Sequence, residues 1–159
     1  MPRPAESGLT PRHWIALTAL PAGVVVTYLH LYKLGLTGAL ACTADGGCEV
    51  AQFSSYGAFL GVDVALIGAI GFLLIFLVAL VGVQPRWSDD RRVTQLLALL
   101  VYPALLFTLR LKYGEFIVLK TFCVWCAFLT AMIVLHAVLV WLDWRRVNGE
   151  RRTANGERL

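Results

Sequence analysis

The chain has 159 residues, of which 58% are hydrophobic and 15% are charged, and its mean hydropathy is +0.72. This composition excludes an ordinary soluble domain of this size, because such domains carry many more charged residues. The formal net charge of +4 could suit nucleic acid, but the basic residues flank long apolar runs, which is the pattern of a membrane protein. We therefore expect a membrane protein with no nucleic-acid partner.

Four apolar runs of about 17 to 21 residues are each long enough to cross a hydrocarbon core of ~30 Å as a helix. They cover residues 14–32, 64–83, 93–109 and 122–142. The first run is too long for the apolar part of a secretory signal, so it predicts an uncleaved helix. The sequence thus predicts an all-α, four-helix transmembrane bundle over residues 14–142, between an N-terminal segment, 1–13, and a basic tail, 143–159.

The basic residues are distributed unevenly about these four runs. Ten of the fourteen lie on one side of a four-span arrangement: Arg3, Arg12, Arg86, Arg91, Arg92, Arg145, Arg146, Arg151, Arg152 and Arg158. The other side has Lys33, Arg110, Lys112 and Lys120. The positive-inside rule then places both termini in the cytoplasm and the 33–56 connection outside. In a bacterium, the outer face of the cell membrane is where disulfides form and persist.

The four cysteines form two spaced couples on this predicted outer side. Cys42 and Cys48 lie in the polar 33–56 connection, around an Asp-Gly-Gly turn signal that lets the thiols pair. Cys123 and Cys126 are three residues apart at the start of the last run, on one face of a helix. Thr121 is the expected N-cap, so Cys123 would lie in the first turn, where the helix dipole and the charge of Lys120 favour a thiolate.

Aromatic side chains cluster at the same predicted boundary, at Tyr56, Phe59, Phe122 and Trp125. They could wall a flat ring, or they could form the ordinary aromatic belt of a membrane interface. The second helix is expected to open at Gly57, and small residues recur through it at Gly61, Ala65 and Gly68. Asp63, near the outer end of this helix, is either solvated at the interface or functional. From Val147 to Leu159 we expect a tail without regular structure.

The order of these motifs resembles the vitamin K epoxide reductase family in its bacterial form. The matching elements are Cys42-x5-Cys48-Glu49-Val50, Ser54-Ser55-Tyr56-Gly57, Phe59-x-Gly61-Val62 and Cys123-Val124-Trp125-Cys126. The resemblance covers residues 17–142. It implies four transmembrane helices around a quinone pocket that is open to the outer leaflet. It also implies that a secreted thioredoxin-like or DsbA-like protein is oxidised while a membrane quinone, ubiquinone or menaquinone, is reduced.

The resemblance also implies a role for each matched residue. Cys42 would exchange with the partner protein, and Cys48 would pass electrons to Cys123. Cys126 would be the sulfur beside the quinone. Ser54 matches a serine that the family keeps near the loop and the pocket.

The sequence departs from the family pattern at several positions. Asp63 stands where bacterial members often have proline. Thr130 stands where the vertebrate pattern has a tyrosine, and the second helix has no asparagine, which favours a plain quinone over vitamin K epoxide. Some bacterial members carry a fused thioredoxin-like domain, which is missing from these 159 residues, so we expect the partner to be a separate chain.

Three other readings compete with this one. The DsbB family resembles the chain in span number and quinone use, but its Cys-x-x-Cys precedes the widely spaced pair, the reverse of the order here. A metal or haem protein could use the cysteines, or His30 and His136, as ligands, although an oxidising face disfavours four free thiolates. A membrane scaffold with static disulfides is the third reading, and exchange between the pairs would distinguish it.

Overall fold

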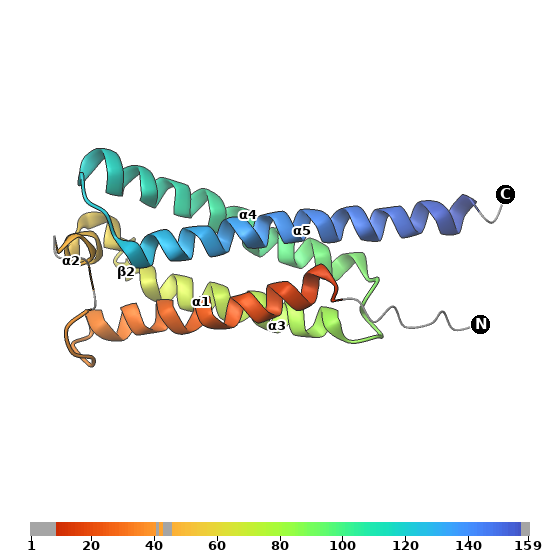
Figure 1. Ribbon diagram of the computed structural model, residues 1–159, viewed down its shortest axis with the longest axis horizontal. Coiled ribbons are helices and arrows are strands. Elements are labelled where there is room, and N and C mark those ends of the chain that lie inside the picture. The colour runs from red at the N-terminus through yellow and green to blue at the C-terminus, as the bar shows by residue number, and fades with distance from the viewer. Residues whose placement is uncertain (1–8, 41, 43–45, 157–159) are drawn as a thin grey trace.

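The structure, a computed structural model that describes residues 9–40, 42 and 46–156, is a bundle of long helices (Figure 1). These helices are α1 (Pro11–Lys33), α3 (Val64–Val83), α4 (Arg91–Tyr113) and α5 (Val124–Gly156). In the described part of the chain, four helical segments have the length and apolar composition needed to cross a membrane. The prediction of an all-α, multi-pass membrane protein is therefore confirmed.

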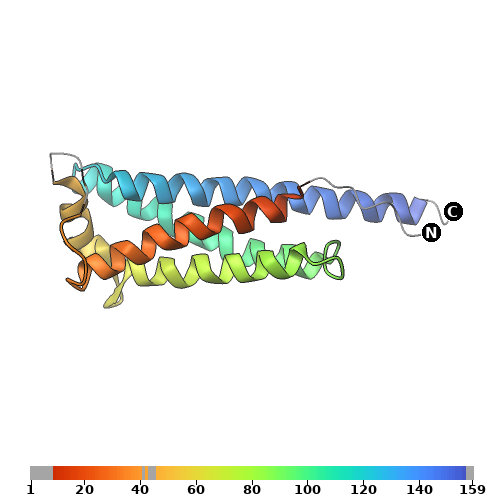
Figure 2. The ribbon, with the colours of Figure 1, turned by 60° about the horizontal axis from the view of Figure 1, so that its bottom comes forward.

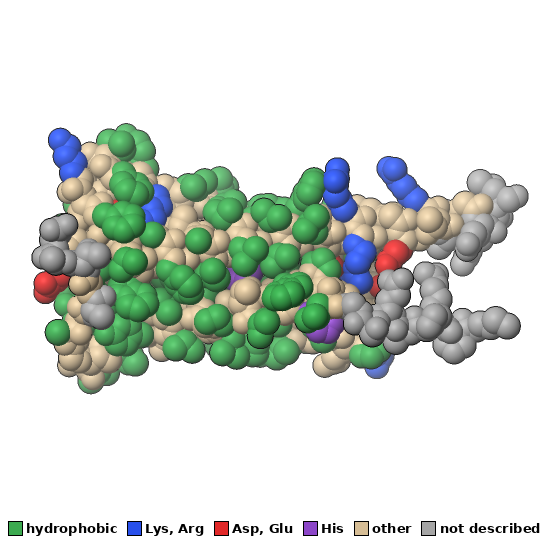
Figure 3. Space-filling view, viewed as in Figure 1, with side chains coloured by type: hydrophobic (Ala, Val, Ile, Leu, Met, Phe, Trp, Pro, Cys, Tyr) green, Lys and Arg blue, Asp and Glu red, His purple; other side chains and the backbone are tan. Residues whose placement is uncertain are grey.

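The long helices run antiparallel in chain order, so that α1 begins and α5 ends at the same end of the molecule (Figures 1 and 2). We call this the terminal end. The opposite end, built by residues 33–63 and 113–126, is the cysteine end. Helices α1 and α4 each pack against both α3 and α5. The bundle core is made of apolar side chains, and other hydrophobic side chains project outward over the middle of the molecule (Figure 3).

Helix starts in this chain are set by short capping residues. Pro11 occupies the first position of α1, where its missing N–H is no loss, and Thr10 bonds the ring of His13 at 2.8 Å. The Asp90 carboxylate accepts a hydrogen bond from the Arg92 N–H at 2.8 Å and so caps α4. Each cap satisfies backbone groups that the helix itself leaves without partners.

The terminal end is held together by a buried arginine. Arg12 and Asp143 are both fully buried, and the Arg12 Nε donates to the Asp143 Oδ2 at 2.9 Å. The same guanidinium donates to the Thr94 hydroxyl at 3.0 Å and to the Trp87 carbonyl at 2.6 Å. One side chain thereby ties α1 to α4, to α5 and to the connection between α3 and α4. Such a set of partners offsets much of the cost of burying the charge.

The predicted absence of regular structure is wrong for residues 147–156, which belong to α5, while residues 157–159 lie outside the described part of the chain. Val147 is still buried, and Arg146 donates to the Ser88 carbonyl at 2.7 Å, so bundle contacts extend past the apolar run. Beyond them, Asn148, Gly149, Asn155 and Gly156 are poor helix formers, yet the helix continues to Gly156. The helix therefore extends beyond the apolar run, which ends at residue 142.

Short elements fill the cysteine end: α2 (Gly47–Phe53), η1 (Ser55–Gly57), β1 (Ala58–Phe59) and β2 (Val62–Asp63). The two strands form an antiparallel hairpin whose turn has positive φ angles at Leu60 (53°) and Gly61 (81°). The expected helix start at Gly57 is therefore wrong, and α3 begins at Val64. Asp63 caps it by accepting a hydrogen bond from the Ala65 N–H at 3.1 Å. Of the predicted small-residue positions, Gly68 meets α1, because a β-carbon there would lie 2.9 Å from Val26.

The connection between α4 and α5 is also more helical than the sequence suggested. A π-helical turn, η2 (Gly114–Val118), follows α4 directly. Lys120 then adopts a positive φ of 49°, and α5 starts at Val124. This turn contains Glu115, whose side chain is buried inside the protein.

Candidate redox site

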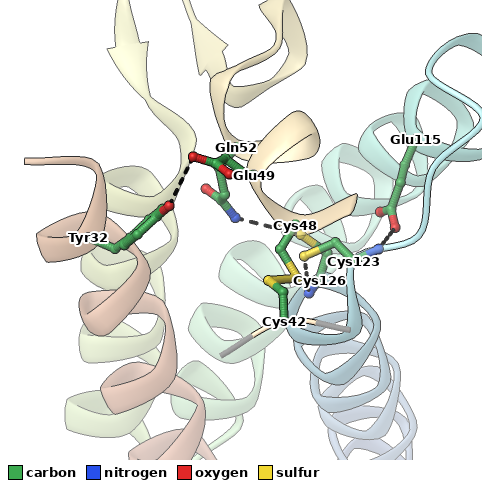
Figure 4. The surroundings of a disulfide bond; sticks show 8 residues. All are labelled: Tyr32, Cys42, Cys48, Glu49, Gln52, Glu115, Cys123 and Cys126. Carbon is green, nitrogen blue, oxygen red and sulfur yellow. Dashed lines mark hydrogen bonds between the residues drawn. A yellow bond between two sulfur atoms is a disulfide. The ribbon is translucent and has the colours of Figure 1, made fainter. Parts of the chain in front are cut away.

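The structure brings all four cysteines together at the cysteine end (Figure 4). Cys42 and Cys48 form a disulfide, with their Cα atoms 6.1 Å apart, whereas Cys123 and Cys126 are free thiols. Cys48 and Cys123 are fully buried, and Cys42 and Cys126 are partly exposed. Each pair therefore has one buried and one accessible sulfur.

A glycine brings the two pairs close to each other. A β-carbon at Gly47 would lie 2.4 Å from the Phe122 carbonyl oxygen and 2.6 Å from the Thr121 hydroxyl, so only a residue without a side chain fits. Gly47 directly precedes Cys48, and Phe122 directly precedes Cys123. The two buried cysteines consequently lie next to each other, as Figure 4 shows.

Cys123 itself precedes the first residue of α5, so it occupies the N-cap position that the sequence assigned to Thr121. That assignment is wrong by two residues. The Cys123 Sγ accepts a hydrogen bond from the Cys126 N–H at 3.3 Å, as a capping side chain does. The hydrogen bond from the Cys126 thiol, together with backbone N–H groups, lowers the pKa of Cys123 to about 7, although burial and the Glu115 charge oppose the change. Lys120, which was expected to contribute, is exposed.

Glu115 is a site residue that the sequence reading missed. Its carboxylate is 5% exposed, and its Oε1 accepts a hydrogen bond from the Cys123 N–H at 2.6 Å. Its Oε2 accepts one from the Lys112 Nζ at 2.8 Å, and its backbone oxygen accepts one from the Thr121 N–H at 3.1 Å. The available signal was an acid in an otherwise apolar connection, three residues after a lysine.

A cavity of about 390 Å³ opens beside the cysteine helix, between α1, α3, α4 and α5. Most of its lining is apolar, and its polar lining includes Cys126, Gln52, Lys112 and Glu115. The Gln52 amide approaches the Cys126 Sγ at 3.8 Å. This volume and this mixture of apolar wall and few polar groups are typical of small-molecule sites. A flat, largely apolar ring with polar oxygens fits such a lining.

The five residues predicted to bind a quinone take different positions around this cavity. Tyr56 lines it, with its ring packed over Gly114. Phe59 lies behind the lining, edge-on to Phe107, which does face the cavity. The remaining positions lie outside the lining: Ser54 donates to the Ala51 carbonyl at 2.9 Å, Trp125 packs edge-on to Tyr28, and Phe122 is half exposed beside Phe116.

Asp63 belongs to a polar cluster that fastens the hairpin to α1. Its carboxylate pairs with the His30 Nδ1 at 2.6 Å and with the Lys33 Nζ at 2.5 Å, and Lys33 also donates to the Gly57 carbonyl at 2.8 Å. Burial acts to raise the pKa of Asp63, but the hydrogen bonds from Lys33, His30 and the Ala65 N–H outweigh it, so the pKa is lowered. These contacts make Asp63 a structural partner of α1.

The residues considered for a metal or haem have other partners. His30 pairs with Asp63, whereas the buried His136 bonds the Thr18 hydroxyl at 2.8 Å. Among the described residues, no three or more His, Cys, Asp or Glu side chains gather in a way that could hold a metal ion.

Comparison with protein families agrees with the arrangement of spans and cysteines. Residues 13–141, most of the chain, match the model of the vitamin K epoxide reductase family. The match includes both cysteine pairs, the cavity residues, and all of the long helices except the first residues of α1 and the C-terminal part of α5. The protein therefore belongs to the vitamin K epoxide reductase family and is a membrane thiol oxidoreductase.

Proposed function

We propose that this protein oxidises a separate thioredoxin-like protein and passes the electrons through its two cysteine pairs to a membrane quinone. The net reaction converts the partner's dithiol and a quinone into the partner's disulfide and a quinol. The observation that carries the proposal is that Cys126 lines the cavity while Cys123 adjoins the Cys42–Cys48 disulfide. The two ends of an electron path are thus present within one site.

The first exchange takes place at Cys42. It is the accessible sulfur of its disulfide, since Cys48 is fully buried. A thiolate of the partner attacks the Cys42 sulfur, and Cys48 leaves as a thiolate. The second thiol of the partner then resolves the mixed disulfide, so that the partner is oxidised and the Cys42–Cys48 pair is reduced.

The second exchange moves the electrons inward. The Cys48 thiolate attacks Cys123 of a Cys123–Cys126 disulfide, and Cys126 leaves as a thiolate. Cys42 then attacks Cys48, which releases Cys123 and restores the Cys42–Cys48 disulfide. The lowered pKa of Cys123, about 7, makes it a good leaving group in this step. The product has the disulfide and the free thiols that the structure has.

The last step takes place at the cavity. The Cys123–Cys126 dithiol forms its disulfide and gives up two electrons and two protons. A quinone supplies the acceptor for both, because its two ring oxygens become hydroxyl groups. The apolar lining from α1, α3 and α4 supports a lipid-soluble acceptor, and Gln52 is positioned to contact the Cys126 sulfur. Thr130, which lines the cavity in place of the vertebrate tyrosine, supports a plain quinone, ubiquinone or menaquinone.

We place the cysteine end on the outer, oxidising face of a bacterial cell membrane. Among the described residues, the terminal end carries most of the arginines, including Arg86, Arg91, Arg92 and Arg145. The positive-inside rule then puts that end in the cytoplasm. Disulfide exchange with a secreted partner requires the opposite end to face the compartment where disulfides persist.

The test is an anaerobic reaction of the purified protein with a reduced thioredoxin-like protein and with ubiquinone or menaquinone analogues. Quinol formation is followed by absorbance, and the partner's disulfide by mass spectrometry. We expect one quinol for each partner disulfide formed. Replacement of Cys126 by alanine should abolish quinol formation. Unchanged quinol formation in that variant would refute the path through the cavity and favour a scaffold with static disulfides.

A further inference from the structure

The cavity has a largely buried cation in its wall. Lys112 lies in the last turn of α4 and lines the cavity, and its side chain is 12% exposed. Phe116 and Phe122 lie beside its ammonium group, with ring centres 5.2 and 5.7 Å from the Nζ. A positive charge in such apolar surroundings acts strongly on any polar atom that enters, because little water screens it.

Glu115 holds this cation in place. It is the acceptor for one Lys112 N–H at 2.8 Å, and no second acceptor for the ammonium lies within hydrogen-bond distance in the described part of the chain. An ammonium group has three N–H donors, so donors are left over for a molecule in the cavity. The other oxygen of the same carboxylate accepts the Cys123 N–H at 2.6 Å. The cation is therefore fixed relative to the cysteine motif by one side chain.

We propose that Lys112 is the hydrogen-bond donor for a ring oxygen of the quinone, and that Glu115 is a positioning residue that keeps the ammonium facing the cavity. This inference rests on the proposed function. A quinone oxygen gains negative charge as electrons reach the ring, so a preplaced cation stabilises that change more than it stabilises binding of the neutral ring. Lys112 thus contributes to affinity and, to a greater extent, to the rate of quinol formation.

A static salt bridge is the competing explanation for Lys112 and Glu115. In that case the pair would shape the cavity, and removing the charge would weaken every ligand of similar size. The two explanations can be distinguished by comparing the affinities of two ligands that have the same ring system, one with ring oxygens and one without them. The pair 1,4-naphthoquinone and naphthalene provides this comparison.

Binding is measured on the full chain with Cys123 and Cys126 both replaced by serine, so that the probe cannot react with their thiols. In this background we expect Lys112→Met to weaken 1,4-naphthoquinone about tenfold, the effect of a lost hydrogen bond to a charged donor, and to leave naphthalene unchanged. The matched control is Arg110→Gln, which removes a cation from the same helical turn. Arg110 is exposed over the Phe59 ring and lies outside the cavity lining, so both affinities should be unchanged.

Turnover is then compared in the protein with its four cysteines intact. We expect Lys112→Met to reduce kcat for quinol formation about tenfold to a hundredfold, with a smaller change in KM, and Arg110→Gln to reduce neither. If Lys112→Met does not fold, Lys112→Gln takes its place, and the same changes in kcat and KM are expected. Equal loss of affinity for both rings, or no loss for either, would overturn the inference. Failure of the parent protein to bind naphthoquinone would instead overturn the proposed quinone site itself.

Discussion

Gly47 and Phe122 are in contact through their backbones, and this contact joins the two halves of the site. A β-carbon at position 47 would lie 2.4 Å from the Phe122 carbonyl oxygen, which no side chain can tolerate without movement of one segment. The following residues of the two segments are Cys48 and Cys123. The spacing of the cysteines in space is therefore set by a residue that carries no chemistry of its own.

We predict that Gly47→Ala slows electron transfer between the two pairs. A displacement of about 1 Å at a reacting centre costs on the order of a hundredfold in rate, so we expect quinol formation to fall about tenfold to a hundredfold. Gly38→Ala is the matched control, because a β-carbon there meets nothing within 4 Å. Equal rates in the two variants would show that the Gly47 contact does not set the distance between the pairs.

Replacing Cys126 by alanine is expected to trap a bond between Cys48 and Cys123. In this variant the Cys123 thiolate attacks Cys48 of the Cys42–Cys48 disulfide and Cys42 leaves as a thiolate, and the new bond persists because the Cys126 thiol that would resolve it is missing. Non-reducing mass spectrometry during reaction with a reduced partner protein should detect the peptide pair that contains residues 48 and 123. Detection of Cys42–Cys48 alone, at every time point, would contradict the relay.

The thiolate of Cys123 is expected to form near neutral pH. With the Cys42–Cys48 disulfide intact, absorbance at 240 nm should follow this titration, with a midpoint near the pKa of about 7. Cys126→Ala removes the hydrogen bond that contributes most to the low value, so the pKa of Cys123 should rise. Glu115→Gln removes a nearby negative charge that raises the pKa of Cys123, so in this variant the pKa of Cys123 should be lower than in the parent protein. A shift in the opposite direction in either variant would disprove the assigned cause.

The Asp63 cluster predicts a pH-dependent contribution to stability. Because folding lowers the pKa of Asp63, its contribution is complete above the ordinary pKa of an aspartate and is lost as the pH falls through the lowered value. Asp63→Asn should therefore lower the Tm at pH 7, and the difference from the parent protein should shrink as the pH approaches 3. A constant difference across this range would show that the ion pairs with His30 and Lys33 contribute nothing.

Breaking the buried pair at the terminal end should destabilise the bundle strongly. Arg12→Met leaves the Asp143 carboxylate buried without its arginine, which costs about 3 to 5 kcal/mol in comparable pairs. Arg145→Gln, which replaces an exposed arginine of α5 at the same end of the molecule, serves as the control. Thermal unfolding in a fixed detergent measures both. A loss of stability no larger than that of the control would show that the other contacts of the terminal end suffice.

Much of this fold was predictable because membrane spans depend on length and hydropathy alone. The third helix of the structure, α3, coincides with the predicted run 64–83. The prediction that this helix begins at Gly57 was wrong. Residues 58–63 form a hairpin with positive φ angles at Leu60 and Gly61, and apolar content does not reveal such a turn. The tail was misjudged for a related reason, since the contacts of Arg146 and Val147 depend on partners far away in the sequence.

The chemistry-bearing residues were predictable to a lesser degree. The spacing of Cys42 and Cys48 allows the disulfide that the structure has, and the family match covers both cysteine pairs. Spacing does not show which face of the bundle is hollow, and of the predicted aromatic residues Tyr56 lines the cavity whereas Phe122 and Trp125 lie outside its lining. Glu115 was missed because a single acid carries no periodic signal, and its importance appears when the π-helical turn directs it inward.

The burial of Cys48 and Cys123 has a consequence for selectivity among oxidants and reductants. Small thiols and peroxides reach sulfur atoms by diffusion. Because Cys48 and Cys123 are fully buried, such molecules cannot reach either of these two sulfurs. In the proposed relay, electrons enter at Cys42 and leave at Cys126, so small oxidants and reductants in the surrounding medium would not reach the two sulfurs between them. The protein around Cys48 and Cys123 therefore shields the proposed exchange between the two pairs from competing redox reactions.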